Sequence, residues 1–489
     1  MSEAARERAH GAVSEARGAA YLTAAKLWFL ATGALLPILL ARILPPDRYG
    51  VYKVVTGAMT VVNALLVTGA VQSVSKFVAE DFARSAEVHR KALILQGALG
   101  LVAATLFAGA APIIAAGLRD AALVSLLRLA AIAIATFGLY AVFMGTTNGR
   151  GLYGKQAALD FAYSTSKVAL ILLGAWIGGV AGALVGFAGA GLLVGLLGIL
   201  LAGTGRSGRA FSMGRLLGFA AGAMSFTLVI NLLLQADLLL VKRLSPAGSS
   251  DLQAGLYSAA LDLSRLPYQA LAVPIALVLL PAVSRGMALD DRAAAGAALR
   301  GALRYVLIGV GLCVTVLASN ALPLLLIVFK SHYAGAAVPL RVVPFGVLAF
   351  SVFYLYATAL VGSGRPLHAA ALGGVTLLLD VALNAALIPR HGIAGAAVAT
   401  SAALAIGAIA SAVFVRSTLG VSFPAATLAR VAIAGAAITA ASSLWPVTGL
   451  IVLVKGGVLT ALFGAALLLL REVGREDLDH LRAIFRAAG

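Results

Sequence analysis

Three cations that stand inside apolar stretches, where a charge is costly, are Lys26, Lys167 and Arg265; for a fourth, Lys455, we expect a non-essential role. Ionised side chains within a membrane span usually face a cavity or one another. Lysine offers an anion a point charge, and arginine offers a planar fork that matches phosphate oxygens. We therefore predict that these three side chains line a cavity for an anionic substrate. Two alternatives remain open: Lys26 could snorkel to the membrane surface, and Asp160 could simply neutralise Lys167 on the same helical face.

Polar acceptors in the apolar stretches form a second set. Asp380 and Asn384 are four residues apart and so share one helical face. Asp237 stands in another apolar stretch. We predict that Asp237, Asp380 and Asn384 couple transport to a cation or a proton. For Asp237, the alternative is an ion pair with Lys242, five residues further on.

The apolar stretch 254–283 combines a charge pair with repeated prolines. Asp262 and Arg265 are three residues apart, so their side chains can meet. Proline removes a backbone hydrogen bond and bends a helix. We predict that Asp262 and the prolines form a gate, against the alternative of a kinked structural helix. The prolines recur every seven residues, at Pro267, Pro274 and Pro281.

These residues must be positioned by membrane-spanning helices. The chain of 489 residues is 61% hydrophobic and 11% charged, whereas soluble proteins are about 25% charged. Apolar runs of helix-spanning length recur from end to end. The pattern predicts an all-α polytopic membrane protein with about fourteen transmembrane helices. The expected spans are 22–43, 51–71, 91–117, 123–145, 157–178, 180–203, 215–241, 254–283, 298–327, 335–361, 367–388, 393–415, 427–445 and 448–470.

The distribution of positive charge predicts the orientation. With both termini inside, inner segments hold 23 of the 37 Lys and Arg residues and outer segments hold 10. Positive residues accumulate in cytoplasmic segments. We therefore expect a multi-pass protein of the cytoplasmic (inner) membrane with both termini in the cytoplasm. The charge is spread over many short loops, so we expect membrane lipids as partners and no nucleic acid.

The chain also contains a repeat. A shift of 213 residues places 149–151 on 362–364 and 179–183 on 392–396, and a shift of 205 places 50–52 on 255–257. Two parallel six-helix lobes followed by two C-terminal helices explain these matches, with a substrate path between the lobes. The expected organisation is a cytoplasmic tail 1–20, an N-lobe 21–203, a linker 204–214, a C-lobe 215–416, two further spans in 417–471 and a cytoplasmic tail 472–489.

Enzyme signatures are weak. No GxxxxGK[ST] loop occurs, and the six histidines form no HExxH motif or paired metal set. The single cysteine, Cys313, excludes a disulfide framework. We therefore expect no catalytic residue, no metal and no cofactor, with a coupling proton or sodium ion at most. A membrane-bound glycosyl- or acyltransferase and a non-transporting scaffold are the rivals from other classes.

Three runs resemble a known family of transporters. Residues 44–52 (LPPDRYGVY) resemble its first outer loop, and 237–241 with 255–260 resemble the start of its second lobe. The run 380–400, with Asp380, Asn384 and the segment GIAGAAVAT, is similar to its eleventh and twelfth helices. The family is the polysaccharide transporter, or Wzx-like, branch of the multidrug/oligosaccharidyl-lipid/polysaccharide exporter superfamily.

The resemblance implies a flippase for polyprenyl-diphosphate-linked oligosaccharides, acting by ion-coupled alternating access in surface polysaccharide biosynthesis. It implies a lipid-linked glycan as substrate and the polysaccharide polymerase and chain-length machinery as further partners. A cation-coupled multidrug exporter (an antiporter) of the same superfamily is the alternative. The first span has few cations besides Lys26, where the peptidoglycan-precursor branch concentrates arginines, which argues against lipid II as the substrate.

Overall fold

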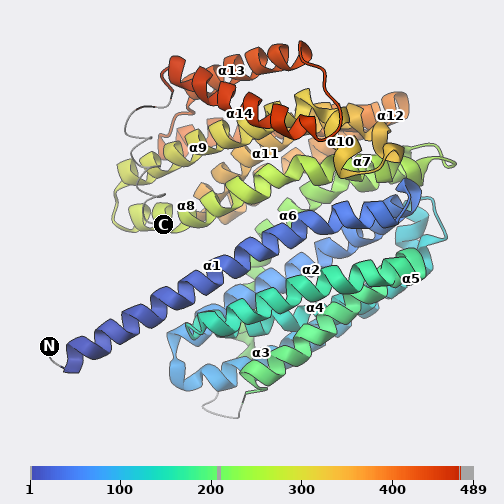
Figure 1. Cartoon of the computed structure of the whole chain (residues 1–489). Coiled ribbons are helices and arrows are strands. Elements are labelled where there is room, and N and C mark those ends of the chain that lie inside the picture. The colour runs from blue at the N-terminus through green and yellow to red at the C-terminus, as the bar shows by residue number, and fades with distance from the viewer. Residues whose placement is uncertain (1–2, 206–210, 473, 475–489) are drawn as a thin grey trace. The chain divides into compact units, whose positions relative to one another are not determined.

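The computed structural model describes residues 3–205, 211–472 and 474, and these form helices joined by short turns, with no strand among them (Figure 1). Parts of the expected tails 1–20 and 472–489 and of the linker 204–214 lie outside the described residues. The helices are α1 (Glu3–Ile43), α2 (Pro46–Glu80), η1 (Phe82–Arg84), α3 (Ser85–Gly117), α4 (Leu123–Gly149), α5 (Tyr153–Ala202), α6 (Met213–Leu244), α7 (Ser250–Pro267), η2 (Tyr268–Ala272), α8 (Val273–Ala288), α9 (Arg292–Ser319), α10 (Ala321–Val328), η3 (Ser331–Ala336), α11 (Ala337–Gly362), α12 (Pro366–Leu419), α13 (Ala425–Ser443) and α14 (Ile451–Leu469).

Twelve helical stretches of the described chain are long and apolar enough to cross a membrane. Two of them, α5 with 50 residues and α12 with 54, are far longer than one crossing requires. A helix of that length spans about 75–80 Å, against a hydrocarbon core of about 30 Å. Each contains a non-helical glycine and is therefore two spans. Counted in this way, the described residues form the fourteen spans that the sequence predicts.

Both long helices turn at glycines in the same way. Gly179 has φ 57° and ψ −136°, and Gly392 has φ 57° and ψ −140°. Only glycine adopts this conformation without strain, because it has no Cβ. The 213-residue shift superimposes these two residues, so the local backbone geometry agrees with the repeat here.

The helices on either side of each turn approach very closely. A Cβ on Gly182 would lie 2.0 Å from the carbonyl oxygen of Gly174, and one on Gly395 would lie 2.4 Å from that of Leu387. Small residues permit such contact between membrane helices. The 213-residue shift relates both members of the two pairs. Each hairpin is therefore closed by a backbone contact that a larger residue would open.

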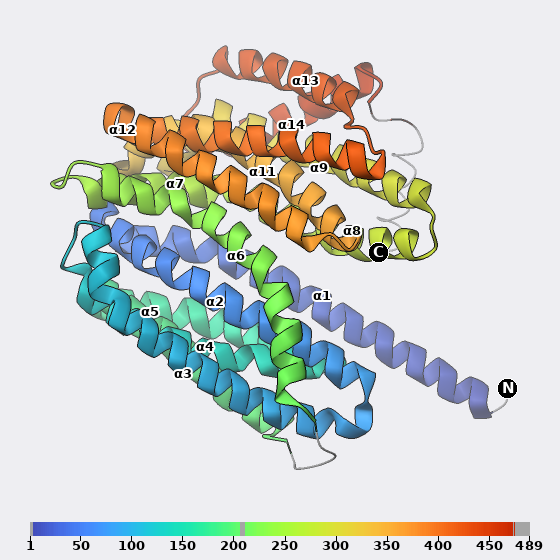
Figure 2. The same cartoon turned by 180° about the vertical axis from the view of Figure 1, so that it is seen from behind.

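The helices form two compact units, Met1–Ser258 and Ala259–Gly489, divided within α7. In the first unit α4 packs against α2, α3 and α5, while α1 packs on α5 and α6 packs on α2 (Figures 1 and 2). In the second unit α11 packs against α12, α9 and α8, and α13 packs on α9 and α14. These arrangements fix the helices that carry the candidate site residues.

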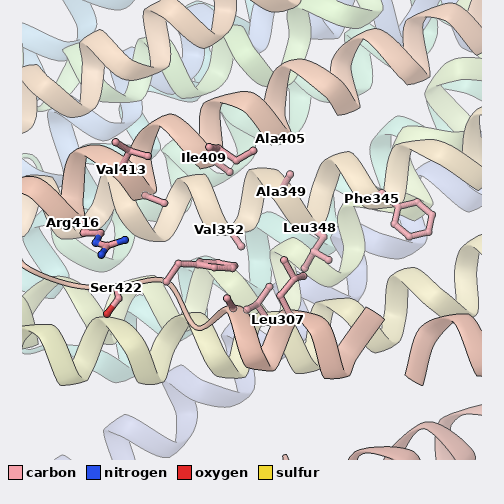
Figure 3. Close-up of a pocket in the computed structure, with 15 residues that line it drawn as sticks. Leu307, Phe345, Leu348, Ala349, Val352, Ala405, Ile409, Val413, Arg416 and Ser422 are labelled. Atoms are coloured by element: carbon pink, nitrogen blue, oxygen red, sulfur yellow. The ribbon is translucent and has the colours of Figure 1, made fainter. Parts of the chain in front are cut away.

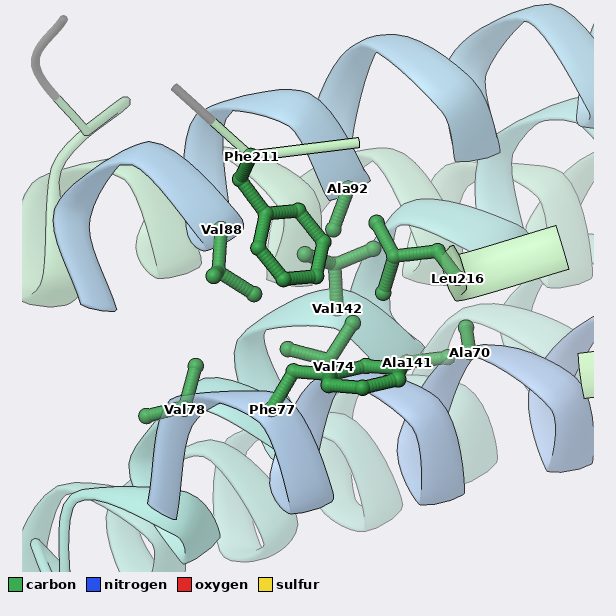
Figure 4. Packing of buried hydrophobic residues seen from close by; sticks show 10 residues of the cluster. All are labelled: Ala70, Val74, Phe77, Val78, Val88, Ala92, Ala141, Val142, Phe211 and Leu216. Atoms are coloured by element: carbon green, nitrogen blue, oxygen red, sulfur yellow. The ribbon is translucent and has the colours of Figure 1, made fainter. Parts of the chain in front are cut away.

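An apolar cluster anchors the start of α6 in the first unit. Phe211 is buried among Phe77 on α2, Val88 on α3 and Val142 on α4 (Figure 4). The rings of Phe77 and Phe211 meet edge to face, with centroids 5.3 Å apart. Such a pair stabilises by about 1 kcal/mol beyond its area. The end of the expected linker is thus held in the core of this unit.

The proline-rich span is a composite of three helical pieces. α7 ends at Pro267, a π-helical turn follows as η2, and α8 begins with Pro274 in its first turn. A proline cannot donate to the preceding turn, so the backbone bonding has to be rearranged around it. The rearrangement is confined to Tyr268–Ala272, while Pro281 lies inside α8.

Candidate functional site

A buried carboxylate holds the cation of the first helix. Lys26 Nζ on α1 lies 2.7 Å from Asp160 Oδ2 on α5, and Tyr140 on α4 donates a 2.5 Å hydrogen bond to Asp160 Oδ1. The Asp160 side chain is 1% exposed, whereas that of Lys26 is 53% exposed. An ammonium has three donors. Asp160 therefore orients Lys26 and leaves N–H groups available on its exposed side.

Aromatic rings continue the same face of α5. Tyr163 stacks on Tyr140 with centroids 4.8 Å apart, and on Phe137 at 5.1 Å. Lys167 Nζ lies 5.7 Å from the centroid of the Tyr163 ring and 5.1 Å from that of Phe187. A cation over a ring face is attracted by the quadrupole of the ring. Lys167 is thus supported by rings and not by an acid.

The alternative in which Asp160 neutralises Lys167 is wrong. The carboxylate pairs with Lys26, and among the described residues no acid forms an ion pair with Lys167. Lys167 therefore brings an uncompensated positive charge to this face of α5, while Lys26 and Asp160 together are neutral. No local sequence pattern points to Tyr140, because its partner Asp160 lies on another helix. Tyr163 follows Asp160 by three residues, a spacing that places it on the same face.

The second unit brings Asp380 and Asn384 together as their spacing predicts. Asn384 Nδ2 donates to Asp380 Oδ1 at 2.8 Å and to the Asp380 carbonyl oxygen at 2.9 Å. It also reaches Thr400 Oγ1 at 3.0 Å, because the turn at Gly392 folds the second half of α12 back along the first. All three side chains are buried. Carboxylate, amide and hydroxyl oxygens are ligands that hard cations prefer.

Asp237 is buried in the first unit without Lys242. It accepts hydrogen bonds from the Tyr257 hydroxyl at 3.1 Å and from the Leu238 amide at 2.8 Å. Lys242 instead donates to Asp120 at 2.6 Å and pairs with Asp251. The alternative of an Asp237–Lys242 pair is therefore wrong.

The expected gate residues lie along the composite span of the second unit. Asp262 and Arg265 are half-buried near the end of α7, and Pro267 is buried beside the π-helical turn. Pro274 and Pro281 are exposed on α8. Arg265 and Asp380 belong to this unit, whereas Lys26, Lys167 and Asp237 belong to the first.

Comparison with solved structures defines the class of fold. The chain resembles a lipid II flippase, MurJ, in an inward closed conformation, with TM-score 0.75, 15% identity and coverage of 92% of this chain and 99% of that one. It also resembles an inward-facing multidrug resistance transporter of the MATE family and MOP superfamily, with TM-score 0.65, 15% identity and coverage of 81% and 94%. A MOP superfamily transporter from Pyrococcus furiosus matches with TM-score 0.60, 14% identity and coverage of 82% and 93%. The fold is that of the multi-pass flippases and exporters of this superfamily.

Sequence comparison gives the family. Residues 39–338, more than half of the chain, match the family described as "Polysaccharide biosynthesis protein". The chain therefore belongs to the polysaccharide biosynthesis protein family, which agrees with the resemblance seen in its sequence. No curated protein sequence matches the chain significantly.

Proposed function

We propose that this protein moves a polyprenyl-diphosphate-linked oligosaccharide across the cytoplasmic membrane for surface polysaccharide biosynthesis. The proposal rests on one observation: the chain belongs to the polysaccharide biosynthesis protein family and has the fold of flippases and exporters. The diphosphate requires cations at membrane depth. Lys167 supports the proposal, because rings and no described acid surround its ammonium.

Lys26 is a second proposed contact for the phosphate. Its charge is balanced by Asp160, yet more than half of the side chain is exposed. A phosphate can bind the exposed side of the ammonium while Asp160 holds the other side, since charge-assisted hydrogen bonds tolerate several partners on one ammonium. Arg265 is a separate candidate cation in the second unit.

The test is complementation of a deletion strain, with surface glycan and accumulated lipid-linked intermediate both measured. We expect Lys167→Gln to lower flipping roughly tenfold, the effect of losing one charged hydrogen bond. Lys155→Gln is the matched control, because Lys155 is an exposed lysine on the same helix that donates only to the Leu201 carbonyl oxygen. Equal activity in both variants, at equal protein abundance, would contradict the proposed role of Lys167.

A multidrug exporter is the competing function, and the same strains test it. If drug resistance falls on deletion while surface glycan and lipid-linked intermediates stay unchanged, the polysaccharide proposal is wrong.

We further propose that ion coupling involves Asp380, Asn384 and Thr400, with Asp237 as a second acidic group. The buried oxygens around Asn384 Nδ2 support this. Thr400→Val keeps the side-chain shape and removes one oxygen. We expect it to weaken the dependence of transport on sodium or on the proton gradient, and Asp380→Asn to remove that dependence. Unchanged ion dependence in both variants would exclude the site.

We propose that the composite span α7–η2–α8 bends during transport. π-helical turns are frequent at functional sites, and this one is bounded by Pro267 and Pro274. Pro267→Ala supplies the missing amide, and we expect it to straighten the span and slow transport at unchanged abundance. Pro112→Ala in α3 is the control, because Pro112 also lies inside a helix. Equal transport rates in the two variants would exclude a gating role for Pro267. Asp262, half-buried one turn before Pro267, is the polar member of the proposed gate.

A further inference from the structure

An apolar groove runs along the second unit between α13 and the pair α11 and α12. α13 packs on α9 and α14, and this leaves a space of about 530 Å³ beside α11 and α12. That volume lies within the range of sites for small ligands, about 300–1,000 Å³. The walls are aliphatic and aromatic, and include Leu307 from α9, Leu348 from α11 and Ile409 from α12.

The two ends of the groove differ in polarity. Figure 3 shows Arg416 and Ser422 at one end and Phe345 at the other, with aliphatic side chains between them. Arg416 is exposed in the last turn of α12, and within the described residues its guanidinium has no ion pair or hydrogen bond. A long apolar cavity with a single unpaired cation at one end has the polarity of an amphiphile with an anionic head.

The surroundings of Arg416 add positive charge. α13 begins at Ala425 beside Ser422 and has no side-chain cap, so its helix dipole places partial positive charge at this end. Glu472 lies close to the same end through its contact with Thr427, but it is already paired with Arg304 and Arg430. Two arginines against one carboxylate leave the local balance positive before Arg416 is counted.

We propose that this groove binds an anionic phospholipid, with one acyl chain along the apolar walls and the phosphate on Arg416. Basic pockets between membrane helices on the cytoplasmic side bind anionic lipid head groups. The expected orientation places Arg416 on that side. The site lies wholly within the second unit and shares no residue with the proposed ion site.

The experiment uses the full-length protein in an uncharged detergent. Its thermal unfolding temperature is measured, and its bound lipid is measured by native mass spectrometry. The probes are phosphatidylglycerol, phosphatidylcholine with the same acyl chains, and inorganic phosphate. We expect phosphatidylglycerol to bind and to raise the unfolding temperature, because a ligand of the folded state stabilises it. Phosphatidylcholine should bind weakly, and inorganic phosphate should have no effect. An equal response to phosphate alone would overturn the proposal, because the acyl chain of the lipid would then contribute nothing to binding.

Two pairs of variants locate the site. Arg416→Gln should raise the half-saturating phosphatidylglycerol concentration roughly tenfold, whereas Arg285→Gln, at another exposed arginine in the last turn of a helix of this unit, should not. Ala405→Phe fills the groove and should abolish binding, whereas Ala410→Phe, an exposed alanine of the same helix outside the groove, should preserve it.

Three outcomes contradict the proposal. The first is an unchanged lipid response in both Arg416→Gln and Ala405→Phe. The second is a dimer that Ala405→Phe dissociates without lipid, which would make a second copy of the chain the occupant. The third concerns Arg416→Lys, which keeps the charge and covers the case in which the glutamine variant does not fold. It should bind phosphatidylglycerol with an affinity between those of the wild type and the glutamine variant, and an affinity equal to that of the wild type in folded Arg416→Lys would contradict the guanidinium as the head-group contact.

Discussion

Gly50 and Gly255 meet backbone to backbone at the starts of α2 and α7. A Cβ on Gly50 would lie 2.1 Å from the Asp251 carbonyl oxygen and 2.6 Å from the Gly255 amide nitrogen. A Cβ on Gly255 would lie 1.8 Å from the Pro46 carbonyl oxygen. The 205-residue shift superimposes these two glycines, so equivalent positions of the repeat touch each other.

Gly50→Ala should therefore destabilise the protein. Its methyl group would meet backbone atoms, which cannot rotate away as a side chain can. Overpacking of this kind costs about 1–3 kcal/mol. The check is the unfolding temperature of the purified protein in detergent. Gly154→Ala is the control, because no atom beyond the neighbouring residues and the local helix backbone lies within 4 Å of the added methyl group. The contact is dispensable if both variants unfold at the same temperature.

Gly392→Ala should weaken the hairpin of α12 by about 1–3 kcal/mol, because an L-residue is strained at φ 57° and ψ −140°. Gly374→Ala in the first half of the same helix has open space around it and should be neutral or stabilising by up to about 1 kcal/mol. Chemical denaturation of the two variants measures the difference. A lower stability of the Gly374 variant would contradict the assignment of strain to the turn.

Lys242→Met should cost about 3 kcal/mol, the lower end for breaking a buried ion pair. The lysine side chain is 1% exposed and bonds to Asp120 and Asp251, which are only partly buried and so remain partly hydrated after the change. Arg128→Met on α4 is the control, because Arg128 is exposed and has no ion pair within the described chain. Similar unfolding temperatures for the two variants would show that the ion pairs of Lys242 with Asp120 and Asp251 do not stabilise the protein.

Glu472→Gln should change stability in a pH-dependent way. Burial raises the pKa of the Glu472 carboxyl, but hydrogen bonds from Arg430, Thr427 and Arg304 outweigh burial and hold the pKa below its ordinary value. A lowered folded-state pKa contributes stability that is present above about pH 4.3, the ordinary value, and is lost as the pH falls through the folded-state pKa.

The wild type should therefore be more stable than Glu472→Gln at pH 7, and this advantage should shrink below about pH 4. Unfolding temperatures measured from pH 7 to pH 3 test this. Asp290→Asn is the control, because the Asp290 side chain is 93% exposed and should show no such trend. A constant difference between wild type and Glu472→Gln at every pH would contradict the prediction.

Local patterns predicted much of the fold. The expected spans 157–178 and 180–203 meet where Gly178 and Gly179 leave the helical conformation, and the spans 367–388 and 393–415 flank Gly392. A glycine at the end of an apolar run can be recognised from the residues next to it, so the sequence alone predicts these two turns. The expected span 298–327 was wrong in one respect, because the helix is interrupted at Asn320, whose buried side chain bonds the Val316 carbonyl oxygen.

Contacts between distant helices were beyond local reasoning. The spacing of Asp380 and Asn384 predicted their contact, since four residues make one turn. The partner of Asp160 lies 134 positions away, and a nearer lysine on the same face was the more obvious choice. Lys242 likewise bonds a loop residue, Asp120, across 122 positions. Which charges pair is decided by helix packing, which a single sequence does not reveal.

The glycine turns at Gly179 and Gly392 also bear on how the protein is made. The turn at Gly179 joins two apolar spans with no charged residue between them, whereas Arg390 and His391 lie directly before the turn at Gly392. A ribosome therefore delivers the first pair to the translocation machinery as one continuous hydrophobic hairpin, whereas the second pair requires Arg390 and His391 to be carried across the bilayer.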